Sequence, residues 1–278
     1  MLDIIISVLF GLVEGITEWL PVSSTGHMIL LEEFISFRNV SEGFFDMFDV
    51  VIQLGAIMAV VVLYWKQIMP IKIRKEHAIK VECDNSIFTM WLKILIACVP
   101  AAIIGILFDD ILDKYLYNGY VVAIMLVLFG IAFIIVENWN KGKNAKINSL
   151  AELGYNTAAL IGIFQVLAAV FPGTSRSGAT IVGALLIGVS RTVAAEFTFF
   201  LAIPVMFGAS LLKILDFGLD FTSLELAVLA TGMIVAFVVS MLVIKFLMGY
   251  IKKHDFKVFG WYRIVLGAVV LLYFALVR

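Results

Sequence analysis

Six long apolar stretches, separated by shorter polar segments, dominate this chain of 278 residues. Each is close to the roughly 20 residues that a helix needs to cross about 30 Å of hydrocarbon. The pattern therefore predicts six membrane-spanning helices, at 47–65, 91–108, 119–137, 194–212, 224–247 and 261–277.

The segments between the spans differ in charge. Lysine and arginine gather in 66–93, in 138–148 and after Gly249, whereas aspartates lie in 109–118 and 213–222. Basic loops stay in the cytoplasm, so the first three segments are predicted inside and the two with aspartates outside.

Two pieces remain, 1–46 and 149–193, and each must begin and end on one side of the membrane to keep this order. Their apolar stretches are short for full crossings, and polar residues interrupt both. We predict two re-entrant helical hairpins, one entering from outside and one from inside, with both chain termini outside. Two ordinary crossings per piece are the alternative.

The two pieces also resemble each other. At a constant offset, GLVEGITEWLPVSS (11–24) matches GIFQVLAAVFPGTS (162–175) in one glycine, one proline and one serine position and pairs a glutamate with a glutamine. We therefore expect one membrane domain over 1–278, built from pseudo-repeats 1–139 and 150–278 in opposite orientations. Such inverted repeats are common in transporters and place a site where interrupted helices meet.

Composition supports this class: 63% of the residues are hydrophobic and 15% are charged. The fold class that we predict is an all-α polytopic membrane protein. The formal net charge of −1 gives no basic field for nucleic acid, so partners are expected among membrane lipids.

The first hairpin carries two acids where lipid tolerates them poorly. Glu14 and Glu18 are four residues apart and face the same side of a helix. Such a pair holds a divalent cation or shares a proton for acid–base work. A solvated helix face is the simpler alternative, but intramembrane acids are usually functional.

The turn PVSSTGH follows these acids. Pro21 ends the incoming helix, and the next one begins within a group that offers hydroxyls and a glycine, namely Ser23, Ser24, Thr25 and Gly26. Helix starts of this kind attract anions, although simple capping explains the residues too. His27 is either an acid–base residue or a packed, hydrogen-bonded histidine.

The second tip, PGTSRSGAT, has the same layout around a cation. Arg176 carries a planar fork suited to phosphate, or it merely pairs with Glu14 or Glu18. Its neighbours supply hydroxyls and close backbone approach: Thr174, Ser175, Ser177, Gly178 and Thr180. Together the two tips predict a phosphate or diphosphate site with hydrolytic groups.

Other intramembrane polar residues rank lower. Asp49, Gln53 and Glu196 are expected either to line the same cavity or to lie at helix ends. Arg191 and Arg263 fall at predicted cytoplasmic edges, where long cationic side chains extend to water.

EGITEWLPVSSTGH and PGTSRSGAT closely resemble the paired signatures of the undecaprenyl-diphosphate phosphatase family, the bacterial bacitracin-resistance membrane phosphatases. FDVVIQLGAI and GVSRTVAAEFTFFLAIPVM extend the resemblance over most of the chain. The family implies removal of the terminal phosphate from a C55 polyprenyl diphosphate, which recycles the carrier for peptidoglycan synthesis. It also implies a multi-pass protein of the bacterial cell membrane with its site open to the extracytoplasmic side.

By motif, the family's glutamate pair corresponds to Glu14 and Glu18, and its serine and histidine to Ser24 and His27. Its phosphate-binding segment corresponds to Ser175, Arg176, Ser177 and Thr180. A divalent cation, Mg²⁺ or Ca²⁺, is implied as cofactor, with the two glutamates as its ligands. Ser24 or water remains open as nucleophile, and His27 or Glu18 as proton acceptor.

The competing hypothesis is a transporter or flippase of polyprenyl phosphate lipids, which the inverted repeat suggests. Association into a homodimer is also left open.

Overall fold

The computed structural model describes residues 1–76, 78–116 and 118–277, and it confirms the six predicted spans. Within those residues, six helices are long and apolar enough to cross a membrane. They comprise Phe44–Leu63, Asn85–Phe108, Gly119–Asn140, Arg191–Phe217, Ser223–Ile251 and Lys257–Leu276.

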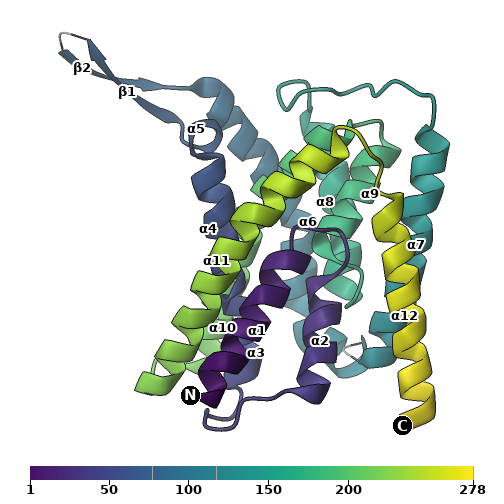
Figure 1. The fold of residues 1–278 in the computed structure, drawn as a ribbon. Coiled ribbons are helices and arrows are strands. Elements are labelled where there is room, and N and C mark those ends of the chain that lie inside the picture. The colour runs from purple at the N-terminus through teal and green to yellow at the C-terminus, as the bar shows by residue number, and fades with distance from the viewer. Residues whose placement is uncertain (77, 117, 278) are drawn as a thin grey trace.

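Two pairs of shorter helices account for the remaining pieces. The first pair is α1 (Leu2–Thr17) and α2 (Ser24–Phe34), and the second is α8 (Tyr155–Val170) and α9 (Arg176–Leu186). In Figure 1 the α1–α2 hairpin enters the bundle from the end that holds both termini, and α8–α9 enters from the opposite end. This arrangement is consistent with two re-entrant hairpins of opposite orientation.

The helices α3 (Phe44–Val51) and α4 (Gln53–Leu63) together form the first span. The other spans are formed by α6 (Asn85–Leu116), α7 (Gly119–Asn140), α10 (Arg191–Phe217), α11 (Ser223–Ile251) and α12 (Lys257–Val277). Most of the segment 109–118, expected as a loop, continues α6 to Leu116.

One short segment departs from the all-α prediction. After the single turn α5 (Trp65–Ile68), strands β1 (Ile71–Glu76) and β2 (Ala78–Cys83) pair antiparallel. They project from the bundle in Figure 1, and within the described residues the bundle itself consists of helices. The hairpin lies within the basic segment 66–93. The charge of this segment predicted its side of the membrane, but the sequence pattern did not predict that its strands pair.

The loop positions agree with the charge pattern. Figure 1 places the β-hairpin, the α7–α8 connection and the α11–α12 connection at one end of the bundle, and both termini at the other. The three basic segments therefore share one side, as the order of the spans requires.

The two halves of the chain interlock. A Cβ on Gly11 of α1 would lie 2.7 Å from the carbonyl oxygen of Gly232 in α11, so these helices meet backbone to backbone. On Gly162 of α8 it would lie 2.4 Å from the carbonyl oxygen of Ala97 in α6. The first helix of each half thus packs closely against a span of the other half.

A reciprocal contact joins the last helices of the halves, α7 and α12. A Cβ on Gly130 would lie 2.7 Å from the Gly260 carbonyl oxygen, and one on Gly260 would lie 2.7 Å from that of Gly130. The next neighbours of these glycines also match, since Arg263 Cβ and Phe133 Cβ are each 3.2 Å from the respective positions. This local two-fold relation pairs Arg263 with Phe133.

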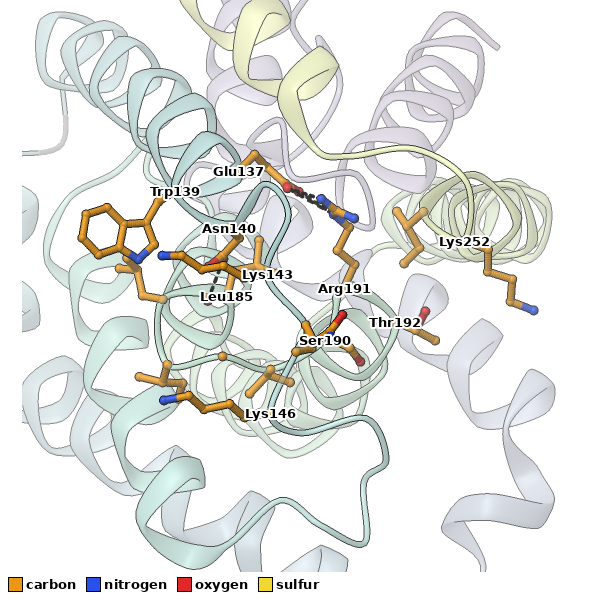
Figure 2. Close-up of a pocket in the computed structure, with 17 residues that line it drawn as sticks. Glu137, Trp139, Asn140, Lys143, Lys146, Leu185, Ser190, Arg191, Thr192 and Lys252 are labelled. Atoms are coloured by element: carbon orange, nitrogen blue, oxygen red, sulfur yellow. Dashed lines mark hydrogen bonds and ion pairs between the residues drawn. The ribbon is translucent and has the colours of Figure 1, made fainter.

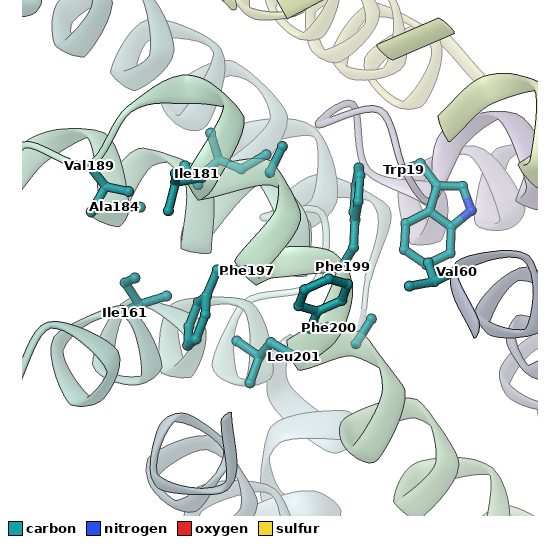
Figure 3. Close-up of a cluster of buried hydrophobic side chains, with 14 of the residues drawn as sticks. Trp19, Val60, Ile161, Ile181, Ala184, Val189, Phe197, Phe199, Phe200 and Leu201 are labelled. Atoms are coloured by element: carbon teal, nitrogen blue, oxygen red, sulfur yellow. The ribbon is translucent and has the colours of Figure 1, made fainter. Parts of the chain in front are cut away.

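A buried aromatic cluster packs behind the hairpin tips (Figure 3). Trp19 follows α1 directly, is fully buried and meets Phe199 of α10 edge to face, with ring centroids 5.2 Å apart. Phe200, also fully buried, meets Tyr64 in the same way. The cluster ties the first tip to the span that follows the second tip.

Candidate functional site at the meeting point of the hairpin tips

The two predicted tips meet inside the bundle. Arg176, the first residue of α9, donates from Nη2 to Oε1 of Glu18, which caps the C-terminus of α1, over 2.9 Å. Ser177 Oγ donates to the backbone carbonyl of Glu18 at 3.2 Å. Glu18 and Arg176, which the sequence placed in separate motifs, are therefore in direct contact.

Glu18 also accepts a short hydrogen bond within its own hairpin. Ser24 Oγ donates to Glu18 Oε2 over 2.6 Å, and both residues are buried. The two carboxylate oxygens thus serve different partners, one a hydroxyl and the other a guanidinium. An anionic acceptor at this distance polarises the Ser24 O–H bond.

Both helix starts are built alike. Ser23 and Ser175 are the N-caps of α2 and α9, and their φ angles of 75° and 71° lie in the left-handed region, which is costly for serine. Each serine Oγ accepts a hydrogen bond from the third residue on, Gly26 at 3.3 Å and Gly178 at 3.1 Å. Two unusual, matching turns at corresponding places support the repeat.

These caps correct the alignment of the two tips by one residue. The constant offset paired Ser24 with Ser175, whereas the turn geometry pairs Ser23 with Ser175. A constant offset cannot reveal a one-residue insertion between helix and cap. Ser24 consequently corresponds to Arg176, and the two equivalent first helical residues carry the hydroxyl and the guanidinium of the site.

His27 lies on the first turns of α2 with both ring nitrogens engaged. Nδ1 is 2.7 Å from the Ser23 carbonyl oxygen and Nε2 is 2.7 Å from the Tyr262 hydroxyl. A carbonyl can only accept, so Nδ1 carries a proton, and in the neutral ring Nε2 then accepts from Tyr262. The rings also stack, with planes 3° apart.

Hydroxyls and carbonyls hold the second tip in shape. Arg176 Nη1 donates to the Thr198 carbonyl of α10 at 2.9 Å. Thr180 Oγ1 contacts Thr198 Oγ1 at 2.9 Å and donates to the Arg176 carbonyl at 2.9 Å. Ser175 and Ser177 hydroxyls lie 3.1 Å apart. Thr180 and Ser177 thus brace Arg176 and the tip.

Several buried polar atoms at and near the tips lack a hydrogen-bond partner among the described residues. They include both carboxylate oxygens of Glu14, both amide atoms of Gln165, Thr174 Oγ1 and Arg176 Nε. Unpaired buried polar groups are costly, so these atoms are candidates for contact with water, a cation or an anionic ligand.

Glu14 supplies a buried carboxylate of the kind that can hold a divalent cation. It is fully buried, and Glu18 and Asp49 act on it electrostatically. No cluster of three or more His, Cys, Asp or Glu residues occurs in the described part of the chain. Mg²⁺ is commonly bound by one or two carboxylates together with substrate phosphates, so two glutamates suffice once a diphosphate adds its oxygens.

The intramembrane polar residues that ranked lower in the sequence analysis lie in different places. Asp49 is half-buried on α3 and interacts electrostatically with Glu14, so it lies toward the first tip. Gln53 begins α4, and Thr25 follows Ser24 in α2, both half-buried. Glu196 interacts instead with Tyr64 and Lys252, and within the described residues no hydrogen bond or ion pair joins it to either tip.

Two residues on α12 were missed or misjudged from sequence. Tyr262 gave no signal beyond its place near a predicted span end. Arg263 was expected to extend to water, but its side chain is fully buried and donates to backbone carbonyls of both tips. The helix begins at Lys257, so Arg263 lies well inside it, and the apolar window starting at 261 hid this depth.

A cavity of about 570 Å³ lies away from the tips (Figure 2). It is bounded by Lys143, Lys146 and Lys252, and Arg191 at its wall pairs with buried Glu137, Nε to Oε1 at 2.9 Å. Arg191 is thus anchored by an ion pair besides reaching toward water. None of the predicted phosphate-site residues lines this cavity.

Fold and site together define a polytopic helical membrane protein with a buried carboxylate–serine–arginine centre. The model of the family described as bacitracin resistance protein BacA matches residues 7–269. The protein named undecaprenyl-diphosphatase from Desulfitobacterium hafniense is 61% identical over 99% of this chain and 97% of its own length.

Similar relatives come from other bacteria. Undecaprenyl-diphosphatase 1 from Clostridium acetobutylicum is 61% identical over 99% of both chains, and undecaprenyl-diphosphatase from Enterococcus faecalis is 60% identical over 98% of this chain and 97% of its own. The chain belongs to the BacA family of bacitracin resistance proteins.

Proposed function

We propose that this protein hydrolyses undecaprenyl diphosphate to undecaprenyl phosphate and inorganic phosphate in the bacterial cell membrane. The single observation that carries the proposal is Glu18, which accepts Ser24 Oγ on one carboxylate oxygen and Arg176 on the other. This is an activated hydroxyl next to an anion-binding fork. Relatives of similar length bear the name of this activity.

Binding is assigned to the cationic and N–H groups of the tips. The diphosphate replaces Glu18 as the partner of the Arg176 guanidinium. The backbone N–H groups at the starts of α2 and α9 add positive potential. Phosphoryl transfer demands chiefly positioning and charge stabilisation, which this arrangement supplies. The polyprenyl tail lies between helices, in contact with lipid.

Ser24 is the nucleophile that the geometry favours over water. Its Oγ attacks the terminal phosphorus as the anhydride P–O bond breaks, and Glu18 takes the hydroxyl proton and passes it to the departing phosphate oxygen. Water then attacks the phosphoserine; Glu18 accepts a proton from that water and returns one to Ser24 Oγ. His27, held by Tyr262, orients the first tip instead of accepting this proton.

Glu14 and Glu18 would hold the divalent cation together with the diphosphate. Bound there, the cation would neutralise phosphate charge that the arginine alone does not balance. The unpartnered carboxylate of Glu14 supports this assignment.

A phosphate-release assay on purified protein with undecaprenyl diphosphate tests the reaction. Glu18→Gln keeps the shape and removes the base, so the rate should fall by roughly 10²–10⁴-fold. Glu152→Gln, on an exposed loop, is the matched control and should leave the rate unchanged. Full activity of Glu18→Gln would refute the mechanism, and trapped phosphate mapped to Ser24 would establish the nucleophile.

The site is proposed to open to the extracytoplasmic side, because the first hairpin enters from the end opposite the basic loops. Exposed Cys83 is the last residue of β2, at the basic end. In a Cys98→Ser background, a membrane-impermeant maleimide should label Cys83 only after cells are opened. A Glu42→Cys variant lacking both native cysteines should label in intact cells, and the reverse pattern would invert the orientation.

A transporter or flippase is the less favoured alternative. It predicts vectorial movement of the lipid in liposomes without phosphate release.

A further inference from the structure

Arg263 is the only described residue whose side chain hydrogen-bonds to the backbone of both hairpin tips. Nη1 donates to the Pro21 carbonyl at 3.2 Å in the first tip. Nη2 donates to the Gly173 and Thr174 carbonyls in the second, each at 2.8 Å. One guanidinium therefore spans the gap between two turns that approach from opposite ends of the bundle.

Burial of the Arg263 side chain carries a large desolvation cost. The side chain is fully buried, no carboxylate within the described residues forms an ion pair with it, and its Nε has no partner. Burying a cation costs several kcal/mol unless polar groups compensate. The guanidinium here is compensated by three carbonyl oxygens and by the Phe129 ring, whose centroid lies 5.8 Å from Cζ. Packing alone would be served better by an apolar side chain.

The fold itself shows that an apolar side chain fits this scaffold. The reciprocal contact of Gly130 and Gly260 pairs Arg263 on α12 with Phe133 on α7, which is also fully buried. One of two equivalent positions thus carries a phenyl ring and the other a guanidinium. Helix packing does not require the charge, whereas both tips depend on it for hydrogen bonds.

The contacted carbonyls belong to the turns that lead into the two capped helices. Pro21 precedes the cap Ser23 closely, and Gly173 and Thr174 precede the cap Ser175. The N–H groups of Gly26 and Gly178 serve the serine caps, so the N–H groups of the first two residues of each helix are the ones that can face an anion. A positive charge beneath both starts also favours an anion in front of them.

We propose that Arg263 is a positioning residue that fixes the two tips relative to each other, so that Ser24 and Arg176 contact the same diphosphate. It acts through the backbone and does not itself contact the substrate. The proposal rests on the proposed function for its catalytic consequence, but the coupling of the tips is a physical property that is measurable without substrate.

The test compares Arg263→Met and Arg263→Lys with Phe133→Met as the matched control at the equivalent position. Hydrogen–deuterium exchange is measured on peptides that cover residues 18–25 and 171–178, in the purified full-length protein in detergent. Both tips should exchange at least tenfold faster in Arg263→Met. Phe133→Met should accelerate exchange in α7 and α12 and leave the two tips as in the wild type.

Phosphate release supplies the second readout. A misplacement of about 1 Å commonly costs on the order of 100-fold, so kcat should fall by about that factor in Arg263→Met with a smaller change in KM. Arg263→Lys keeps the charge but cannot reach both tips, so its kcat should also fall. Phe133→Met should retain kcat within a few-fold.

Three results would overturn the proposal: exchange that rises in one tip or neither, wild-type kcat in Arg263→Met, or full rescue by lysine, which would make charge alone responsible. If Arg263→Met fails to fold, Arg263→Lys carries the exchange measurement. A wild-type protein that releases no phosphate would instead refute the proposed function and leave the exchange result standing.

Discussion

Arg176 Nη2 lies 2.9 Å from Glu18 Oε1, although 158 residues separate the two in the chain. Both side chains are mostly shielded from solvent, at 12% and 6% exposed. A diphosphate competes with Glu18 for the same guanidinium, so we infer that substrate binding releases this carboxylate oxygen. The base would then be freed only when its substrate is present.

Arg176→Lys tests the need for a planar fork. The lysine keeps a positive charge but cannot bond the Thr198 carbonyl and a phosphate simultaneously as the guanidinium can. We expect kcat/KM for phosphate release to fall by roughly 10²–10³-fold. Arg191→Lys, whose native residue pairs with Glu137 away from the tips, serves as control. Near-normal activity of Arg176→Lys would show that charge alone suffices.

Tyr262→Phe removes the hydroxyl that donates to His27 Nε2. A single neutral hydrogen bond contributes about 1 kcal/mol, so phosphate release should fall less than tenfold. Tyr250→Phe is the control, because Tyr250 stacks on His254 in a similar pair at the α11–α12 turn. A loss as large as that of Glu18→Gln would instead make His27 the proton acceptor, against the mechanism proposed above.

Removal of divalent cations tests the assignment of Glu14. A chelator should abolish phosphate release by the wild type, and added Mg²⁺ or Ca²⁺ should restore it. Glu14→Gln should raise the cation concentration for half-maximal activity by about tenfold or more, because one charged ligand is lost. Cation-independent activity, or an unchanged requirement in the variant, would contradict the assignment.

Gly162→Ala tests the close packing of α8 on α6. The new methyl would lie 2.4 Å from the Ala97 carbonyl oxygen, so we expect a loss of about 1–3 kcal/mol and a lower melting temperature. Gly105→Ala, where a Cβ meets nothing within 4 Å, should be neutral or slightly stabilising because alanine favours helix. Equal melting temperatures for the two variants would exclude the tight contact.

Much of the architecture was predictable because lipid imposes strict rules on length and polarity. Six apolar stretches of sufficient length became six spans, and the short interrupted ones became the α1–α2 and α8–α9 hairpins. Glu18 and Arg176 were recognisable as candidate site residues because charges are costly in hydrocarbon. Their direct contact was foreseen only as one of several alternatives.

The remaining features depend on geometry that a linear pattern does not carry. Arg263 appeared interfacial because its depth depends on where α12 begins, and its partners are backbone carbonyls, which every sequence contains. The pairing of Ser23 with Ser175 required the φ angles of the two caps. The β-hairpin after α5 lies in a basic segment. The charge of that segment predicted only its side of the membrane and gave no information on strand pairing.

The interlocking of the two halves has a consequence for biosynthesis. Ser7 on α1 donates to the Val228 carbonyl 221 residues later. The Pro21 carbonyl accepts from Arg263, which is 242 residues later. When the first hairpin leaves the ribosome, the helices that cover it have not yet been made. Glu18 must wait for Arg176 of the second hairpin, and both tips must wait for Arg263 of α12, so a chain truncated before α12 would be inactive even with every catalytic residue present.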